Sequence, residues 1–195
     1  MTQERPTTTR LSKPARREQL LDEALGIVRT RGADGLTLVT LAEAAGVSRP
    51  IVYDHFGTRA GLLLALYRDL DERHRLALED AVRDSPGTVD AIAGLISASY
   101  FACALDIPEF ATLSAALKGN PDLEPTQHAL LTAYTTTMAT ALTPYSALQP
   151  EALHLRCTAL LGAAEALAAE LTHNRATAPE VTTTLTQLIA GGLTP

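Results

Sequence analysis

The sequence predicts an all-α protein, and three of its features support this fold class. Aromatic side chains are scarce, with 3 Phe, 5 Tyr and no Trp in 195 residues, so the core must be mainly aliphatic. Small aliphatic side chains favour closely packed helices. Apolar residues recur at helical spacing between turns that contain Pro or Gly, whereas alternating β-branched runs with hairpin turns are missing from the sequence.

The first helix is expected to start near Pro14 and to end at Gly32. Pro suits the first turn of a helix, and Gly favours the left-handed conformation that ends one. Residues 1–13, rich in Thr and Pro, are expected to form a flexible basic tail. The helical spacing is carried by Leu20, Leu21, Ala24, Leu25 and Val28.

Two short helices separated by Gly46 are expected next. Thr37 can cap the first and Ser48 the second, because each hydroxyl can accept a hydrogen bond from a first-turn N–H. Pro50 falls in the first turn of the second helix, where no intrahelical N–H is needed. The inner face of the first helix is expected to consist of Leu38, Leu41, Ala42 and Ala45.

The spacing within residues 38–56 is typical of a helix-turn-helix. A small Ala42 lets two helices cross closely, and Gly46 permits the tight turn between them. Val52 and Phe56 then form the buried side of the second helix. In this motif the second helix is presented to the DNA major groove. Its outward side chains are expected to be Arg49, Pro50, Tyr53 and His55.

A longer fourth helix is expected from Arg59 to about Val82, capped by Thr58. Further helices should follow, separated by turns near residues 107–108, 119–121, 143–144 and 178–179. The domain boundary is expected inside or just after the long helix, so that one rigid element couples two modules. The predicted division is a tail over 1–13, a helix-turn-helix domain over 14–60 and a helical domain over 61–195.

Charge is unevenly spread along the chain. The net charge is −6, with a pI of about 5.3, which argues against a nucleic-acid partner at first sight. Residues 1–60, however, carry nine Lys and Arg against seven Asp and Glu. Phosphate affinity depends on local basic groups, although a merely solvated tail would show the same charge. The N-terminal basic cluster consists of Arg5, Arg10, Lys13, Arg16 and Arg17.

The stretch from Arg17 to Leu70 resembles the DNA-binding domain of TetR/AcrR-type transcriptional regulators. That domain carries a Tyr-x-x-Phe motif, a short loop, a basic residue and a leucine-rich helix. Two positions depart from the pattern: Arg59 replaces the usual Lys, and Pro50 stands where a small or hydroxyl residue is frequent. Proline cannot donate a hydrogen bond, but it can contact a thymine methyl. The matching residues are Tyr53, His55, Phe56, Arg59 and Leu62.

The resemblance implies contacts with double-stranded operator DNA. Two threonines at the start of the second helix would face a phosphate, where the helix dipole is favourable. Arg49 is the candidate for reading a guanine, Arg59 would clamp a phosphate, and Tyr53 and His55 would contact phosphates. The implied DNA-binding residues are Thr37, Thr40, Ser48, Arg49, Pro50, Tyr53, His55 and Arg59.

The resemblance also implies that residues 61–195 form an effector-binding and dimerisation domain. In residues 151–173 apolar side chains recur in alternating steps of four and three, a seam that packs against another helix. We expect it to pair with its symmetry mate as a four-helix bundle, although a core within one chain would show the same seam. The predicted homodimer interface is Leu153, Leu160, Ala164, Leu167, Leu171, Val181, Leu185 and Leu188.

The effector pocket is expected among the middle helices, with a mostly hydrophobic lining that suits an apolar small molecule. A lone Arg156 or His128 there would meet a carboxylate, and ordinary packing is the alternative for each candidate. The predicted pocket residues are Tyr100, Cys103, Phe110, His128, Tyr134, Met138 and Arg156.

These features predict a dimeric, ligand-responsive repressor that binds a palindromic operator and is released by a small-molecule effector. A helical adaptor that binds protein through Tyr53 and His55 is the alternative. An enzyme is not expected, because the sequence has no GxSxG, HExxH, glycine-rich phosphate loop or EF-hand pattern. No metal or cofactor is expected.

The expected compartment is a reducing cytoplasm. Cys103 and Cys157 are far apart, show no CxxC spacing and should be small buried hydrophobes. No signal peptide and no uncharged apolar run of about 18 residues occur, so no membrane partner is expected.

Overall fold

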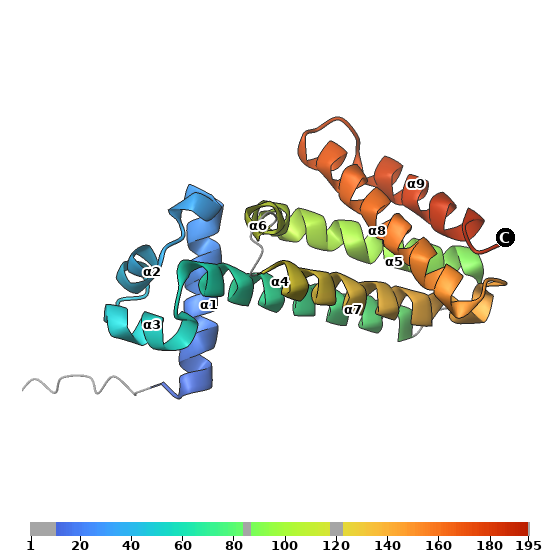
Figure 1. The fold of residues 1–195 in the computed structure, drawn as a ribbon. Helices are drawn as coiled ribbons and strands as arrows, with labels where there is room; N and C mark the ends of the chain where they lie inside the picture. Colours follow the sequence, from blue (N-terminus) through green and yellow to red (C-terminus); the bar gives the residue numbers. More distant parts are fainter. Residues whose placement is uncertain (1–10, 84–86, 118–122, 195) are drawn as a thin grey trace, which may run out of the picture. The chain divides into compact units, whose positions relative to one another are not determined.

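The computed structural model describes residues 11–83, 87–117 and 123–194, and within these ranges the regular structure is entirely helical (Figure 1), confirming the all-α prediction. The chain divides into two compact units between Leu66 and Tyr67. The division lies inside a continuous helix, slightly beyond the predicted domain boundary at residue 60. The helices are α1 (Lys13–Arg31), α2 (Leu38–Ala44), α3 (Arg49–Phe56), α4 (Arg59–Arg83), α5 (Val89–Asp106), α6 (Glu109–Leu117), α7 (Glu124–Leu142), α8 (Pro150–Thr172) and α9 (Ala178–Gly191), with 3-10 turns η1 (Ala33–Gly35) and η2 (Thr143–Tyr145).

Helix α1 begins and ends almost where the sequence predicts. The Ser12 hydroxyl accepts a hydrogen bond from the Ala15 N–H (3.3 Å) and caps the helix. Gly32 ends it with φ at 69°, and its N–H donates to the Val28 carbonyl at 2.9 Å. The predicted tail over 1–13 falls mostly on residues outside the described ranges, and Lys13 already belongs to the helix.

Helices α2 and α3 meet at the turn that the sequence predicts. Gly46 has φ at 64°, a conformation that a side chain would strain, and the Val47 N–H donates to the Ala42 carbonyl at 3.0 Å. Ser48 takes the N-cap position of α3, but its hydroxyl makes no capping hydrogen bond, so the predicted cap is wrong in that detail. The buried core of the unit includes Leu20, Ala24, Leu38, Leu41, Ala42, Val52, Phe56 and Leu62.

The second unit, Tyr67–Pro195, has its own apolar core. Helix α5 packs on α7, α8 and α9, and α8 packs on both α7 and α9; α8 and α9 lie side by side in Figure 1. Cys157 is fully buried as predicted, whereas Cys103 is half-buried. Other buried members of this core include Leu78, Ile96, Phe101, Met138, Leu142 and Ile189.

The predicted dimer seam is mostly the inner face of this second unit, so the prediction of an interface is wrong for its buried members and stays a prediction for Leu167 and Leu188. The repeat of four and three on α8 points toward α5, α7 and α9 because the core of one chain satisfies that pattern. Leu167 is half-buried, and only Leu188, 47% exposed, lies clearly outside. The seam residues buried inside one chain are Leu153, Leu160, Ala164, Leu171, Val181 and Leu185.

Two helices, α5 and α8, are long and apolar enough to cross a membrane by length and composition alone. Both supply side chains to the core of the second unit. Core helices of this kind pass the same test, so the finding is weak evidence for a membrane span.

Candidate nucleic-acid interface and ligand cavity

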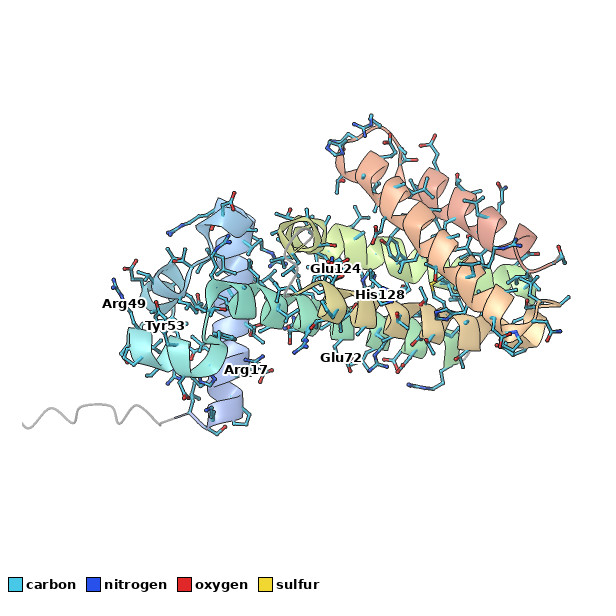
Figure 2. All side chains as sticks on the ribbon, in the orientation of Figure 1. Arg17, Arg49, Tyr53, Glu72, Glu124 and His128 are labelled. Carbon is cyan, nitrogen blue, oxygen red and sulfur yellow. The ribbon has the colours of Figure 1, made fainter. Side chains whose placement is uncertain are left out.

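The outward face of α3 is polar, basic and open. Val52 is fully buried and Phe56 nearly so, which turns the opposite side of the helix outward. Tyr53 is 50% exposed, and Figure 2 shows Arg49 extending outward from this unit. Ile51 is also on this face, 38% exposed, and sequence reasoning missed it. The sequence could have indicated its exposure, because Ile51 immediately precedes the buried Val52 and adjacent residues in a helix point about 100° apart.

Helix α1 holds the second half of α3 in place. Arg17 donates from Nη1 to the His55 carbonyl (3.4 Å), and its guanidinium lies over the Phe56 ring, 5.1 Å from the ring centroid. Lys13 forms an ion pair with Asp54 at 2.8 Å, and this hydrogen bond lowers the pKa of Asp54. Sequence reasoning treated Lys13 and Arg17 only as tail charges. The structure instead assigns them to the support of α3.

Two of the predicted DNA-contacting side chains have modest partners in this structure. Arg49 lies 3.8 Å from a carboxylate oxygen of Glu43, and both side chains are exposed, so the pair contributes little stability. Burial, followed by the nearby Lys13 charge, lowers the pKa of His55. The imidazole is therefore neutral at pH 7 and is suited to a hydrogen bond rather than to a charged phosphate contact.

The two threonines predicted to face a phosphate are engaged with each other. The Thr40 N–H donates to the Thr37 hydroxyl and the Thr37 N–H to the Thr40 hydroxyl, both at 3.0 Å. Thr40 also donates its hydroxyl proton toward the Gly35 carbonyl at 2.9 Å. This reciprocal arrangement is a capping box, so the hydroxyls serve the start of α2.

Arg59 is also placed differently from the prediction of a phosphate clamp. Its Nε donates to the Leu36 carbonyl at 2.9 Å and its Nη2 to the Ala33 carbonyl at 2.7 Å. The Asp34 carboxylate lies 3.5 Å from the same Nη2. These bonds tie the first turn of α4 to the η1 segment, and a phosphate would have to compete with them.

A cavity of about 290 Å³ lies within the second unit, between α4, α5, α6 and α8. Three predicted pocket residues line it: Tyr100, Cys103 and Phe110. Tyr134 lines a neighbouring cavity of about 20 Å³. The remaining predictions, Met138, His128 and Arg156, are wrong for these two cavities.

Each of these three residues lies elsewhere for a physical reason. Met138 is buried in the apolar core. His128 lies on the exposed side of α7, labelled in Figure 2. The Arg156 stem lies close to Gly192 beyond the end of α9.

His74 is the central cavity residue that sequence reasoning missed. Its ring centroid lies 5.3 Å from that of Tyr100, 5.7 Å from that of Phe110 and 5.5 Å from that of Tyr134. The side chain is only 7% exposed, and this burial lowers its pKa. A signal existed, because His74 continues the four-residue spacing of Leu66 and Leu70 along α4.

Two buried polar atoms at these cavities have no hydrogen-bond partner within the part of the chain that the structure describes. They are His74 Nε2 and the Tyr134 hydroxyl. Burial raises the pKa of Tyr134 above its usual value, so the hydroxyl keeps its proton. Unsatisfied buried polar groups are costly, so these two atoms are candidate hydrogen-bonding points for a ligand.

The first unit, with a tight turn at Gly46 followed by a two-turn helix that has one exposed face, is a helix-turn-helix domain of the DNA-binding class. Residues 20–66 match the family model described as bacterial regulatory proteins of the tetR family. The N-terminal unit is therefore similar to the DNA-binding domain of tetR-family regulators, as the sequence predicts. This similarity to DNA-binding regulators supports a regulator rather than an enzyme.

Relatives and solved structures agree with this family. The HTH-type transcriptional regulator BetI of Brucella suis biovar 1 is 30% identical over 90 residues, which are 46% of each chain. The match thus spans about half the length of the curated relatives. A TetR-family regulator from Streptomyces coelicolor is 24% identical, with a TM-score of 0.73, 93% of this chain and 82% of that one covered.

A second solved structure shares the whole fold and was determined with a ligand. The transcriptional regulator FadR from Bacillus subtilis, in complex with stearoyl-CoA, is 16% identical with a TM-score of 0.76. The likeness covers 90% of this chain and 98% of that one. At this identity it shows the fold alone.

Proposed function

We propose that this protein is a ligand-responsive transcriptional repressor that binds a palindromic operator as a homodimer and releases it when a small molecule binds. The observation that carries the proposal is the exposed face of α3, which is held by α1 and backed by a buried core. Such a regulator would act in the cytoplasm, where chromosomal DNA lies. The adaptor alternative has no comparable support from its relatives.

The DNA contacts would be made mainly by α3. Arg49 would read a guanine through two parallel hydrogen bonds, the commonest specific contact in the major groove. Pro50 and Ile51 offer apolar surface that suits thymine methyls. Tyr53 and the neutral His55 would donate hydrogen bonds to phosphates, and Ser48, whose hydroxyl is not used as a cap, is available to do the same.

A homodimer would supply the second reading helix. A two-turn helix specifies few base pairs, whereas two such helices about 34 to 36 Å apart read successive major grooves. We propose that the partner packs on the outer side of α8 and α9, not on the buried seam. Leu155, 72% exposed, and Leu188 are the large apolar side chains there. They are accompanied on α8 by exposed small residues: Ala159, Gly162 and Ala166.

The effector would act through α4, which contributes to both units. Its first residue, Arg59, is bonded to the segment before α2, and its middle supplies Leu70 and His74 to the cavity. A ligand that binds better to one orientation of α4 shifts the population toward that state. It would lower DNA affinity by the same factor by which DNA lowers ligand affinity.

A footprinting and gel-shift search of the DNA flanking the protein's own coding region tests this function. We expect a protected palindrome whose binding weakens steeply with salt, because phosphate contacts release counterions. The absence of any protected palindrome, there or in a genomic selection, would refute the repressor. A protein-binding adaptor would show no salt-dependent affinity for duplex DNA.

A further inference from the structure

The charged side chain that lines the 290 Å³ cavity is negative. Among the described residues that line it, Glu165 is the only Asp, Glu, Lys or Arg. The same residue lines the smaller neighbouring cavity, and its charge contributes to the raised pKa of Tyr100. Neither Arg156 nor His128 lines either cavity, so neither is placed to meet a ligand carboxylate.

The walls of the cavity are aromatic and closely spaced. Tyr100 and His74 stack with an interplanar angle of 29°, and Phe110 meets His74 edge-on at 87°. All three line both cavities. Aromatic faces attract cations and stack on flat rings, so this wall favours a planar, electron-poor ligand.

His74 supplies a hydrogen-bond acceptor to the same place. Interaction with the Tyr100 backbone favours a proton on the ring, although burial has the larger effect and lowers its pKa. Nε2 is buried and has no hydrogen-bond partner among the described residues. A neutral imidazole carries one ring proton, so a proton held at Nδ1 would leave a lone pair at Nε2. His173, at the edge of the cavity, already has Nδ1 within 2.6 Å of the Ala169 carbonyl oxygen.

We propose that the cavity selects planar aromatic cations that carry an N–H donor and discriminates against carboxylates and phosphates. Glu165 attracts the positive charge, Tyr100 and Phe110 hold the ring, and His74 Nε2 accepts from the N–H. This inference rests on the proposed function, because it names the class of effector for the proposed regulator. It separates this protein from the FadR neighbour, whose stearoyl-CoA ligand carries phosphates.

Four two-ring probes of similar size test the proposal by calorimetry on the full chain. They are 4-aminoquinoline, which is protonated at neutral pH, the permanent cation 1-methylquinolinium, the neutral 1-methylnaphthalene and the anion 1-naphthoate. We expect affinity to fall in that order. The first step should be about fivefold, the size of one net hydrogen bond. The second should be about 25-fold, because one cation–π contact and the attraction of Glu165 each contribute about fivefold.

Two variants separate the contributions. Glu165→Gln should weaken both cations about fivefold and leave 1-methylnaphthalene unchanged, since it removes charge at constant size. His74→Phe keeps a flat ring, so it should abolish the advantage of 4-aminoquinoline over 1-methylquinolinium. The matched control is Glu151→Gln, because Glu151 lies on the exposed side of α8 and lines neither cavity. It should change none of the four affinities.

Three outcomes would overturn the inference: 1-naphthoate binding as tightly as the cations, Glu165→Gln having no effect, or no probe binding at millimolar concentration. Operator binding without any probe is measured in parallel. A protein that ranks the probes as expected but binds no DNA would refute the regulator and keep the cavity assignment. DNA binding combined with a preference for 1-naphthoate would keep the regulator and refute the cavity assignment.

Discussion

At the scale of single residues, Arg49 is the side chain on which specificity depends. Its ion pair with Glu43, at 3.8 Å, is exposed and therefore competes only weakly with a base edge. We expect Arg49→Ala to cost about 1–3 kcal/mol of operator affinity and to relax preference at one base pair. Gel shifts on single-base operator variants measure both effects.

Arg83→Ala is the matched control for Arg49→Ala, because it removes the same charge at the exposed end of α4, where the guanidinium pairs with Asp80 at 2.7 Å. It should leave base preference unchanged. If Arg49→Ala also leaves affinity and preference unchanged, the assignment of α3 readout to Arg49 is wrong.

Asp71 makes stability depend on pH. Burial raises the pKa of this carboxyl to about 6, from a usual value near 3.8. Between these values the folded state holds a proton that the unfolded state has lost, so stability falls as pH rises and stays lower above pH 6. We expect Asp71→Asn to stabilise the protein at pH 7 by roughly 1–3 kcal/mol.

The advantage of Asp71→Asn should shrink as pH falls through 6 and vanish near pH 4, because the wild-type carboxyl is then neutral in both states. Urea denaturation of both proteins across this range measures the difference in the free energy of unfolding. An advantage that is constant with pH would mean that the buried charge is not its source.

At the scale of elements, the connection between α1 and α2 depends on a side chain from α4. Arg59 donates charged hydrogen bonds to the Ala33 and Leu36 carbonyls. We expect Arg59→Ala to lower the free energy of unfolding by about 1.5–3 kcal/mol, the usual contribution of a hydrogen bond to a charged group. Arg59→Lys should recover part of it, since one ammonium cannot reproduce the fork. Chemical denaturation measures both.

A different result for Arg59→Ala would support the phosphate contact that the sequence predicts for Arg59. If Arg59→Ala leaves stability unchanged, weakens binding to every DNA sequence and lowers the salt slope by about one contact, Arg59 is a phosphate clamp. Thr37→Ala offers a comparison within the same unit, because it removes a capping box and should cost about 1 kcal/mol without involving α4.

At the scale of the whole molecule, the proposed dimer interface is the outer side of α8 and α9 and not the buried seam. We expect Leu155→Glu on the outer side of α8 to give a monomer, because a buried charge without a partner is costly in an interface. Sedimentation velocity detects the change in mass. The monomer should also lose operator affinity, since two half-sites are then bound independently.

Leu76→Glu is the control for the dimer, because Leu76 is 46% exposed on α4 and does not belong to the proposed surface. It should sediment as the wild type does. A Leu155→Glu variant that keeps the wild-type mass would exclude the outer side of α8 as the interface.

The helix-turn-helix was predictable because its determinants are local. A cap at Thr37, a turn at Gly46 and a buried pair at Val52 and Phe56 are spaced by fixed helical geometry, and the structure has each where the sequence predicts it. The DNA-contacting residues remain predictions. Arg59 illustrates the limit, because its carbonyl partners lie more than twenty residues away and carry no sequence signature.

The second unit shows what the sequence by itself could not decide. The seam on α8 has the same period whether it meets a helix of its own chain or of another. Only the tertiary structure turned Leu153 and Leu160 inward and left Leu155 outside. The cavity has the same origin: His74, Tyr100 and Glu165 come from three helices, and packing alone brings them together. Sequence therefore determined the elements and the turn of the helix-turn-helix, while tertiary packing decided which faces remain free to bind.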